Sequence, residues 1–134
     1  MQEGAGKFFI LASFFYLAAG PLMGFLMAYL RGKWVLRLMA AHTHFNIMGW
    51  VSMMIFGFSY NFLPVLAGKE LYSDTLPYVH FVLGNVGLLG MGFVWVGSRF
   101  PKSPIKPKAV WPFGLMVFIS FILYIFNMIM TLMF

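Results

Sequence analysis

The sequence predicts an all-α fold, a bundle of four transmembrane helices that forms a single domain over residues 1–134. Of the 134 residues, 62% are hydrophobic and 9% are charged, whereas roughly 25% of residues are charged in soluble proteins. Strong hydrophobicity without alternation argues against a transmembrane β-barrel. Four uncharged stretches each reach the roughly 20 residues that a spanning helix needs. We therefore expect helices over about 8–30, 38–66, 76–98 and 109–133.

Each element follows from local signals. The first apolar run is too long for the hydrophobic region of a cleaved signal peptide, so we expect it to be retained. Pro64 predicts that the second helix ends nearby, and Gly68 is a suitable turn residue. Prolines at 101, 104 and 107 predict a connection without helix between the third and fourth spans.

The charges are concentrated on one side of the bundle. Seven of the nine Lys and Arg residues lie in the first and third connections, namely Arg31, Lys33, Arg37, Arg99, Lys102, Lys106 and Lys108. The positive-inside rule places this basic side in the cytoplasm. The chain has no cysteine, which excludes disulfides, iron–sulfur clusters and covalently attached c-type heme.

Two histidines, His42 and His44, lie near the start of the second span, close to the basic side. Ionisable residues inside a membrane are costly and count as candidate functional residues. Imidazoles at this depth suit heme iron, and heme propionates would then reach basic residues such as Arg37 and Arg99. The alternative is that both histidines simply hydrogen-bond to neighbouring helices.

Helical periodicity separates the two histidines. Residues two apart on a helix face nearly opposite ways, so His42 and His44 cannot ligate one iron from the same chain. Gly49 continues the His42 face and leaves room for a flat macrocycle to approach, although small residues also serve helix packing. His80 enters the third span from the other side of the membrane, roughly 30 Å from His42 in depth. We expect His80 to be structural and paired with Tyr60 or Asn61.

Several motifs resemble subunit I of the heme-copper oxidases: Ala41-His42-Thr43-His44-Phe45, Met54 to Phe58, Asn61 to Pro64 and Val79-His80-Phe81. That subunit contains twelve helices in three groups of four, and this chain resembles one group. The resemblance implies a homotrimer in which His42 of one protomer and His44 of the next hold one heme b. It also implies that Arg99 binds a propionate and that the basic side faces outward, opposite to the positive-inside rule. The family's copper site needs further histidines, so no copper is expected.

The sequence therefore predicts a heme protein for electron transfer or for binding of O2 or NO, in a bacterial or archaeal inner membrane. One alternative is an oxygen or nitric oxide reductase, and another is a scaffold or channel without cofactor. The expected partners are the lipid bilayer, further copies of the chain, and a quinol or redox partner protein. No nucleic acid is expected.

Overall fold

The computed structural model describes residues 4–30 and 32–134. All regular structure in these residues is helical, and four helices among them are long and apolar enough to cross a membrane. They span Gly6–Tyr29, Val35–Ala67, Leu76–Gly97 and Pro107–Met133. The predicted all-α class and the four potential spans are thus confirmed.

Two of the four spans are composite. The first span is α1 (Gly6–Tyr29) and the third is α4 (Leu76–Gly97). The second runs through the 3₁₀ helix η1 (Lys33–Leu38), α2 (Met39–His44), the π-helix η2 (Phe45–Ser52) and α3 (Met53–Ala67). The fourth begins with the 3₁₀ helix η3 (Pro107–Val110) and continues as α5 (Trp111–Met133). The third connection is therefore partly helical, because proline is tolerated in the first turn of a helix.

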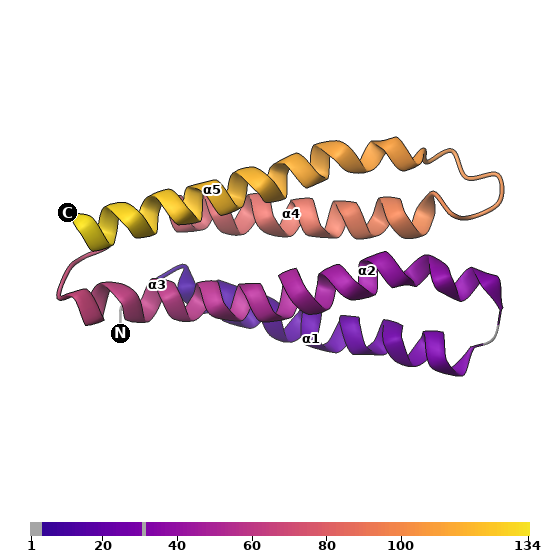
Figure 1. Cartoon of the computed structure of the whole chain (residues 1–134), viewed down its shortest axis with the longest axis horizontal. Helices are drawn as coiled ribbons and strands as arrows, with labels where there is room; N and C mark the ends of the chain where they lie inside the picture. Colours follow the sequence, from indigo (N-terminus) through magenta and orange to yellow (C-terminus); the bar gives the residue numbers. More distant parts are fainter. Residues whose placement is uncertain (1–3, 31) are drawn as a thin grey trace.

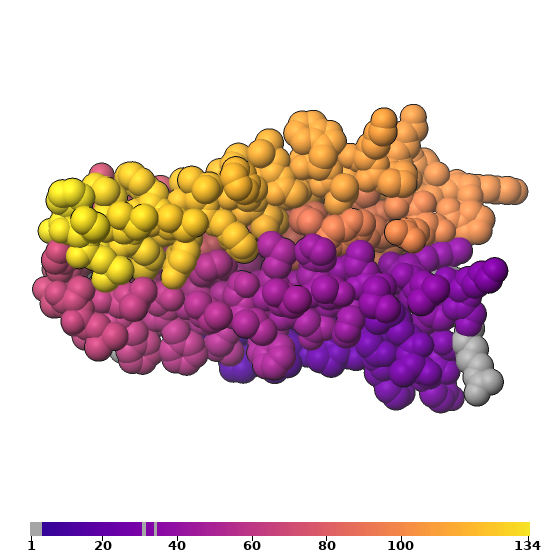
Figure 2. Space-filling model, viewed as in Figure 1, coloured from indigo at the N-terminus to yellow at the C-terminus, as the bar shows by residue number. Residues whose placement is uncertain are grey.

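The helices form two antiparallel hairpins that lie side by side (Figure 1). The first hairpin pairs α1 with the second span, and the second pairs α4 with α5. The start of α1, the 68–75 loop and the end of α5 share one end of the bundle, and the basic connections share the other. The space-filling view shows side chains in contact between the two hairpins (Figure 2).

Glycines allow the helices of each hairpin to approach closely. A Cβ added at Gly6 would lie 2.8 Å from the Gly57 carbonyl oxygen, and one added at Gly57 would lie 2.8 Å from the Gly6 oxygen. In the second hairpin, a Cβ at Gly87 would lie 2.7 Å from the Phe113 oxygen. Small residues at membrane helix crossings serve this purpose in general.

The second span continues past Pro64 and ends at Ala67, one residue beyond the expected end at 66. Gly68 then adopts the left-handed conformation, with φ +63°, and the Lys69 N–H donates to the Pro64 oxygen at 2.9 Å. Glycine is favoured in this terminating position because it has no Cβ. The expected turn at Gly68 is confirmed.

Hydrogen bonds at two asparagines connect distant parts of the chain. The Tyr16 hydroxyl on α1 donates to Asn85 Oδ1 on α4 at 2.9 Å, as expected for a bond between helices. Asn127 on α5 bonds the backbone of the 68–75 loop, accepting from Ser73 N and donating to Ser73 O, both at 3.1 Å. The Asn127 amide thus fixes the loop to the end of α5.

Candidate histidine site at the basic end

His42 and His44 lie in the last turn of α2, immediately before the eight-residue π-helix η2. π-helical turns are rare and frequently occur at functional sites. Both histidines lie within the first turns of the second span, at the end of the bundle that carries the basic connections (Figure 1). The π-helix η2 therefore begins directly after the two histidines.

The His42 imidazole is half-buried against α1. Its Nδ1 lies 2.8 Å from the Gly20 carbonyl oxygen, which can only accept, so Nδ1 carries the proton. Asn46 Nδ2 lies 3.1 Å from the same Nδ1 but only 2.8 Å from the His42 carbonyl oxygen, to which it donates. These contacts fix the tautomer and leave the lone pair on Nε2.

Two glycines of α1 make room for this arrangement, and the sequence analysis did not single them out. A Cβ on Gly20 would lie 2.8 Å from the Asn46 amide atoms, and a Cβ on Gly24 would lie 2.8 Å from His42 Cε1. The Gly-x-x-x-Gly spacing of these two residues is a known signal for close helix packing in membranes. That signal was present in the sequence.

The His44 imidazole faces the other hairpin. Its Nδ1 lies 2.9 Å from the Ala40 carbonyl oxygen, so it too is protonated on Nδ1. The His44 ring centroid lies 4.3 Å from the Trp95 ring on α4. The expectation that the two histidines address different neighbours is thus confirmed, because His42 packs on α1 and His44 on α4.

Gly49, which was predicted to allow a macrocycle to approach, is buried against the Tyr16 side chain. In this structure it allows α1 and η2 to pack closely. A flat ligand at this position would have to replace the Tyr16 ring. The role of Gly49 in cofactor binding stays a prediction.

The basic residues named from the sequence occur around the same end of the bundle. The Arg37 guanidinium carbon lies 5.0 Å from the centroid of the Phe100 ring, so a cation–π contact joins the first and third connections. Arg99 is exposed beside Phe100. Arg31 lies outside the described residues. Cationic side chains are therefore available to an anionic group bound near His42 or His44.

His80 lies near the opposite end of the bundle, in the first turns of α4. It is fully buried, and its Nδ1 lies 2.9 Å from the Tyr60 hydroxyl oxygen, so the expected pairing with Tyr60 is confirmed. Rings of Phe9, Phe56 and Tyr124 surround it at centroid distances of 4.7, 4.6 and 5.6 Å. His80 does not join the His42–His44 site.

Chemically, the basic end offers two imidazoles whose Nδ1 atoms are bound to backbone carbonyls. Among the described residues, Nε2 of neither histidine has a hydrogen-bond partner. The described ranges also contain no cluster of three or more His, Cys, Asp or Glu side chains able to hold a metal ion. Axial ligation of heme iron needs only one or two such groups.

Over residues 4–30 and 32–134, the fold is thus that of an all-helical protein with four helices suited to cross a membrane. Comparison of the chain with protein-family models, with curated proteins and with solved structures gave no match.

Proposed function

We propose that the chain is a b-type heme protein of the bacterial or archaeal inner membrane, acting in electron transfer or in binding O2 or NO. The observation that supports this most is the hydrogen bonding of His42 and His44. Histidines that ligate a metal usually donate their other ring N–H to a carbonyl or carboxylate, which fixes the tautomer. Both residues have this arrangement, with Nδ1 donating and Nε2 available.

The proposed heme lies between protomers of a homo-oligomer, for which we favour a trimer. His42 packs on α1 and His44 on α4. The two Nε2 atoms of one chain therefore lie in different surroundings. A ring of identical subunits brings one surface of each chain against a different surface of the next. His42 of one protomer and His44 of its neighbour would then hold the heme iron between them. The resemblance to one third of the heme-copper oxidase subunit is consistent with such a ring.

When bound, heme b supplies a one-electron iron couple. The residues of this chain hold it and tune it: His42 and His44 ligate, and Arg37 and Arg99 bind the propionates through charge-assisted hydrogen bonds. We expect Arg99→Ala to lower heme retention or the midpoint potential, since a nearby cation favours the more negative, reduced state. Spectroelectrochemistry of the purified variant checks this. Unchanged heme content and potential would assign Arg99 to membrane topology alone.

The first test of the proposal is the absorption spectrum of the purified chain, oxidised and reduced. We expect a Soret band with a low-spin, six-coordinate spectrum. A preparation that stays colourless after heme reconstitution would falsify heme binding and favour the scaffold or channel. A ferrous carbon monoxide difference spectrum detects an open iron position, which the alternative of an oxygen or nitric oxide reductase requires.

A mixing experiment tests the arrangement between protomers. His42→Ala and His44→Ala oligomers should each lose the six-coordinate spectrum, whereas a co-expressed mixture should recover part of it. Recovery is expected because a His44→Ala subunit still offers His42, and its His42→Ala neighbour still offers His44. His80→Gln serves as the control and should leave the spectrum unchanged. No recovery in assembled mixed oligomers would contradict the shared site.

A further inference from the structure

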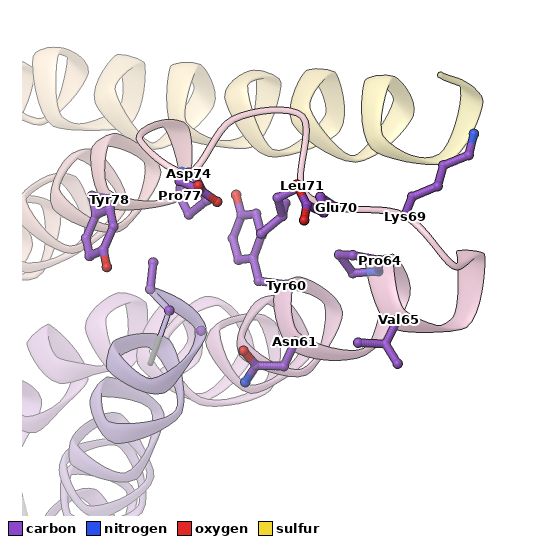
Figure 3. A pocket seen from close by; sticks show the side chains of 13 residues that line it. Tyr60, Asn61, Pro64, Val65, Lys69, Glu70, Leu71, Asp74, Pro77 and Tyr78 are labelled. Carbon is purple, nitrogen blue, oxygen red and sulfur yellow. The ribbon is translucent and has the colours of Figure 1, made fainter. Parts of the chain in front are cut away.

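A pocket of about 560 Å³ lies at the end of the bundle opposite His42 and His44. The start of α1, the end of α3, the 68–75 loop and the start of α4 form its walls (Figure 3). Its size lies within the range of roughly 300–1,000 Å³ that is typical of sites for small molecules. Because apolar spans end here and charged residues follow, the pocket lies at the depth expected for lipid headgroups.

Opposite walls of this pocket carry opposite electrostatic character. Glu70 and Asp74 from the loop provide carboxylates on one wall. The Lys69 ammonium does not cover them, because it points toward the end of α5 and donates to the Leu132 oxygen at 3.2 Å. The other wall includes the start of α1, where Ala5 makes no side-chain capping bond. The Lys7 and Phe8 N–H groups already donate to the Gly4 and Ala5 oxygens, at 3.2 and 3.0 Å. This wall therefore offers the partial positive charge of a helix start.

A buried hydroxyl, that of Tyr60, also lines the pocket, and either it or the neighbouring His80 ring carries a proton without an acceptor. Tyr60 is 4% exposed, and its oxygen lies 2.9 Å from His80 Nδ1. Among the described residues, His80 Nε2 is buried without a hydrogen-bond partner. If Tyr60 donates to Nδ1, a buried Nε2–H has no acceptor. If Nδ1 donates instead, Nε2 keeps only a lone pair, and the Tyr60 O–H is free to donate to a ligand in the pocket. Burying a donor without an acceptor is costly, so an acceptor in the pocket stabilises the second state.

The rim of the pocket is apolar and exposed. Val65 is 74% exposed and Tyr78 is 43% exposed, and both line the opening. On a protein whose spans contact lipid, these side chains are placed to pack against acyl chains while the polar groups lie deeper in the pocket. The ligand that fits is therefore amphiphilic, with a donor-rich cation and an acceptor-rich anion in one headgroup.

We propose that this pocket binds the headgroup of a zwitterionic phospholipid that carries a primary ammonium, as in phosphatidylethanolamine. The ammonium N–H groups donate to Glu70 and Asp74, and the phosphate accepts from Tyr60 and lies beside the partial positive charge at the start of α1. Charge-assisted hydrogen bonds of this kind are the stronger ones. Phosphatidylcholine has no N–H on its quaternary ammonium, and anionic phosphatidylglycerol is repelled by the two carboxylates. The site should therefore discriminate between the three lipids.

The test uses the full-length chain in phosphatidylcholine nanodiscs with a minor fraction of either phosphatidylethanolamine or phosphatidylglycerol. Native mass spectrometry then counts the lipids that remain bound. We expect phosphatidylethanolamine to be enriched about threefold or more over its bulk fraction, as for solvated ion pairs of modest strength. Phosphatidylglycerol should not be enriched. Equal retention of both lipids, or preference for phosphatidylglycerol, would overturn the proposal.

Variants locate the binding in the pocket. Glu70→Gln with Asp74→Asn should abolish the enrichment without unfolding the chain, because both carboxylates are exposed. Tyr60→Phe should reduce it. Tyr72→Phe is the matched control, since Tyr72 lies in the same loop but packs on Phe126 instead of lining the pocket. Enrichment that survives the double substitution would show that the lipid binds elsewhere, and loss of enrichment in Tyr72→Phe would assign the effect to the loop as a whole.

Discussion

At the scale of single residues, the position of the His42 ring depends on the absence of a side chain on α1. The imidazole lies over Gly24, and its Nδ1 proton is held by the Gly20 carbonyl. The position of the His42 imidazole can therefore be changed by a substitution on α1, with His42 itself unaltered. The same logic does not apply to His44, whose Nδ1 is bound by its own helix at Ala40.

We expect Gly24→Ala to displace the His42 ring, because the new Cβ would lie 2.8 Å from Cε1. Overpacking of this kind costs about 1–3 kcal/mol, and the shifted Nε2 should lower heme occupancy. Thermal unfolding in detergent and the heme-to-protein ratio measure the two effects. The control is Gly114→Ala, where nothing lies within 4 Å of the added Cβ. Equal behaviour of the two variants would contradict the packing of His42 on α1.

Sequence reasoning identified several of these residues for sound physical reasons. Period and depth along a helix predicted that His42 and His44 face different neighbours and that His80 pairs with Tyr60 or Asn61, of which Tyr60 is the partner. Asn127 was harder to place, because its partner is the backbone of a loop whose path no local pattern gives. The cation–π contact of Arg37 with Phe100 likewise depends on two connections meeting in space.

At the scale of elements, the second span differs most from a regular helix. It passes from 3₁₀ through α and π to α geometry between Lys33 and Ala67. A helix that widens to π geometry holds an extra residue, and each residue of an α-helix turns the chain by about 100°. The π segment η2 therefore sets the rotation of His42 and Asn46 relative to α3. Apolar residues of the same kinds form both geometries, so no local pattern predicts η2.

Deletion of Ile47, an exposed residue within η2, tests this role. The shorter segment should return to α geometry and turn His42 by about 100° relative to α3. We expect loss of the contact with Gly20, a lower melting temperature and loss of bound heme. Ile47→Leu keeps the length and should leave all three unchanged. A deletion variant with full heme content would show that η2 does not orient the histidines.

The 68–75 loop is a second element held by contacts distant in sequence. The Asn127 amide binds both backbone groups of Ser73, and the Thr131 hydroxyl accepts from Tyr72 N at 3.0 Å. We expect Asn127→Leu to destabilise the chain by about 1–3 kcal/mol, because the half-buried backbone groups of Ser73 lose their partners. Limited proteolysis should then cleave the loop faster. Cleavage in the 98–106 connection serves as the internal reference, and equal acceleration at both places would argue against a local effect.

At the scale of the whole molecule, four antiparallel spans give the bundle two chemically distinct ends. One end carries His42, His44 and most of the cations. The other carries the pocket with Glu70 and Asp74. Between them, aromatic side chains form much of the core. The composition and the length of the uncharged stretches were enough to predict the four spans. In lipid, unpaired backbone groups are so costly that few structures other than helices can cross the membrane.

Reporter fusions test the arrangement of the spans. Reporters at the N-terminus, at the C-terminus and within the 68–75 loop should all lie on one side of the membrane, and a reporter at Lys106 on the other. Accessibility to a membrane-impermeant label measures each position in intact cells. Termini on opposite sides would contradict four spans. A basic end in the cytoplasm would agree with the positive-inside rule. A basic end on the outer side would agree with the resemblance to the oxidase subunit.

Because the number of spans is even, the chain ends on the side of the membrane on which it begins. This affects how such a bundle can be duplicated within one longer chain. The start of α1 and the end of α5 lie at the same end (Figure 1). A tandem duplication of the gene would therefore join one copy to the next through a short linker, without an added span and without reversing the orientation of any copy. A unit with an odd number of spans would invert at every junction. Copies of this bundle that associate side by side are thus suited to fusion into a single longer chain with the same interfaces.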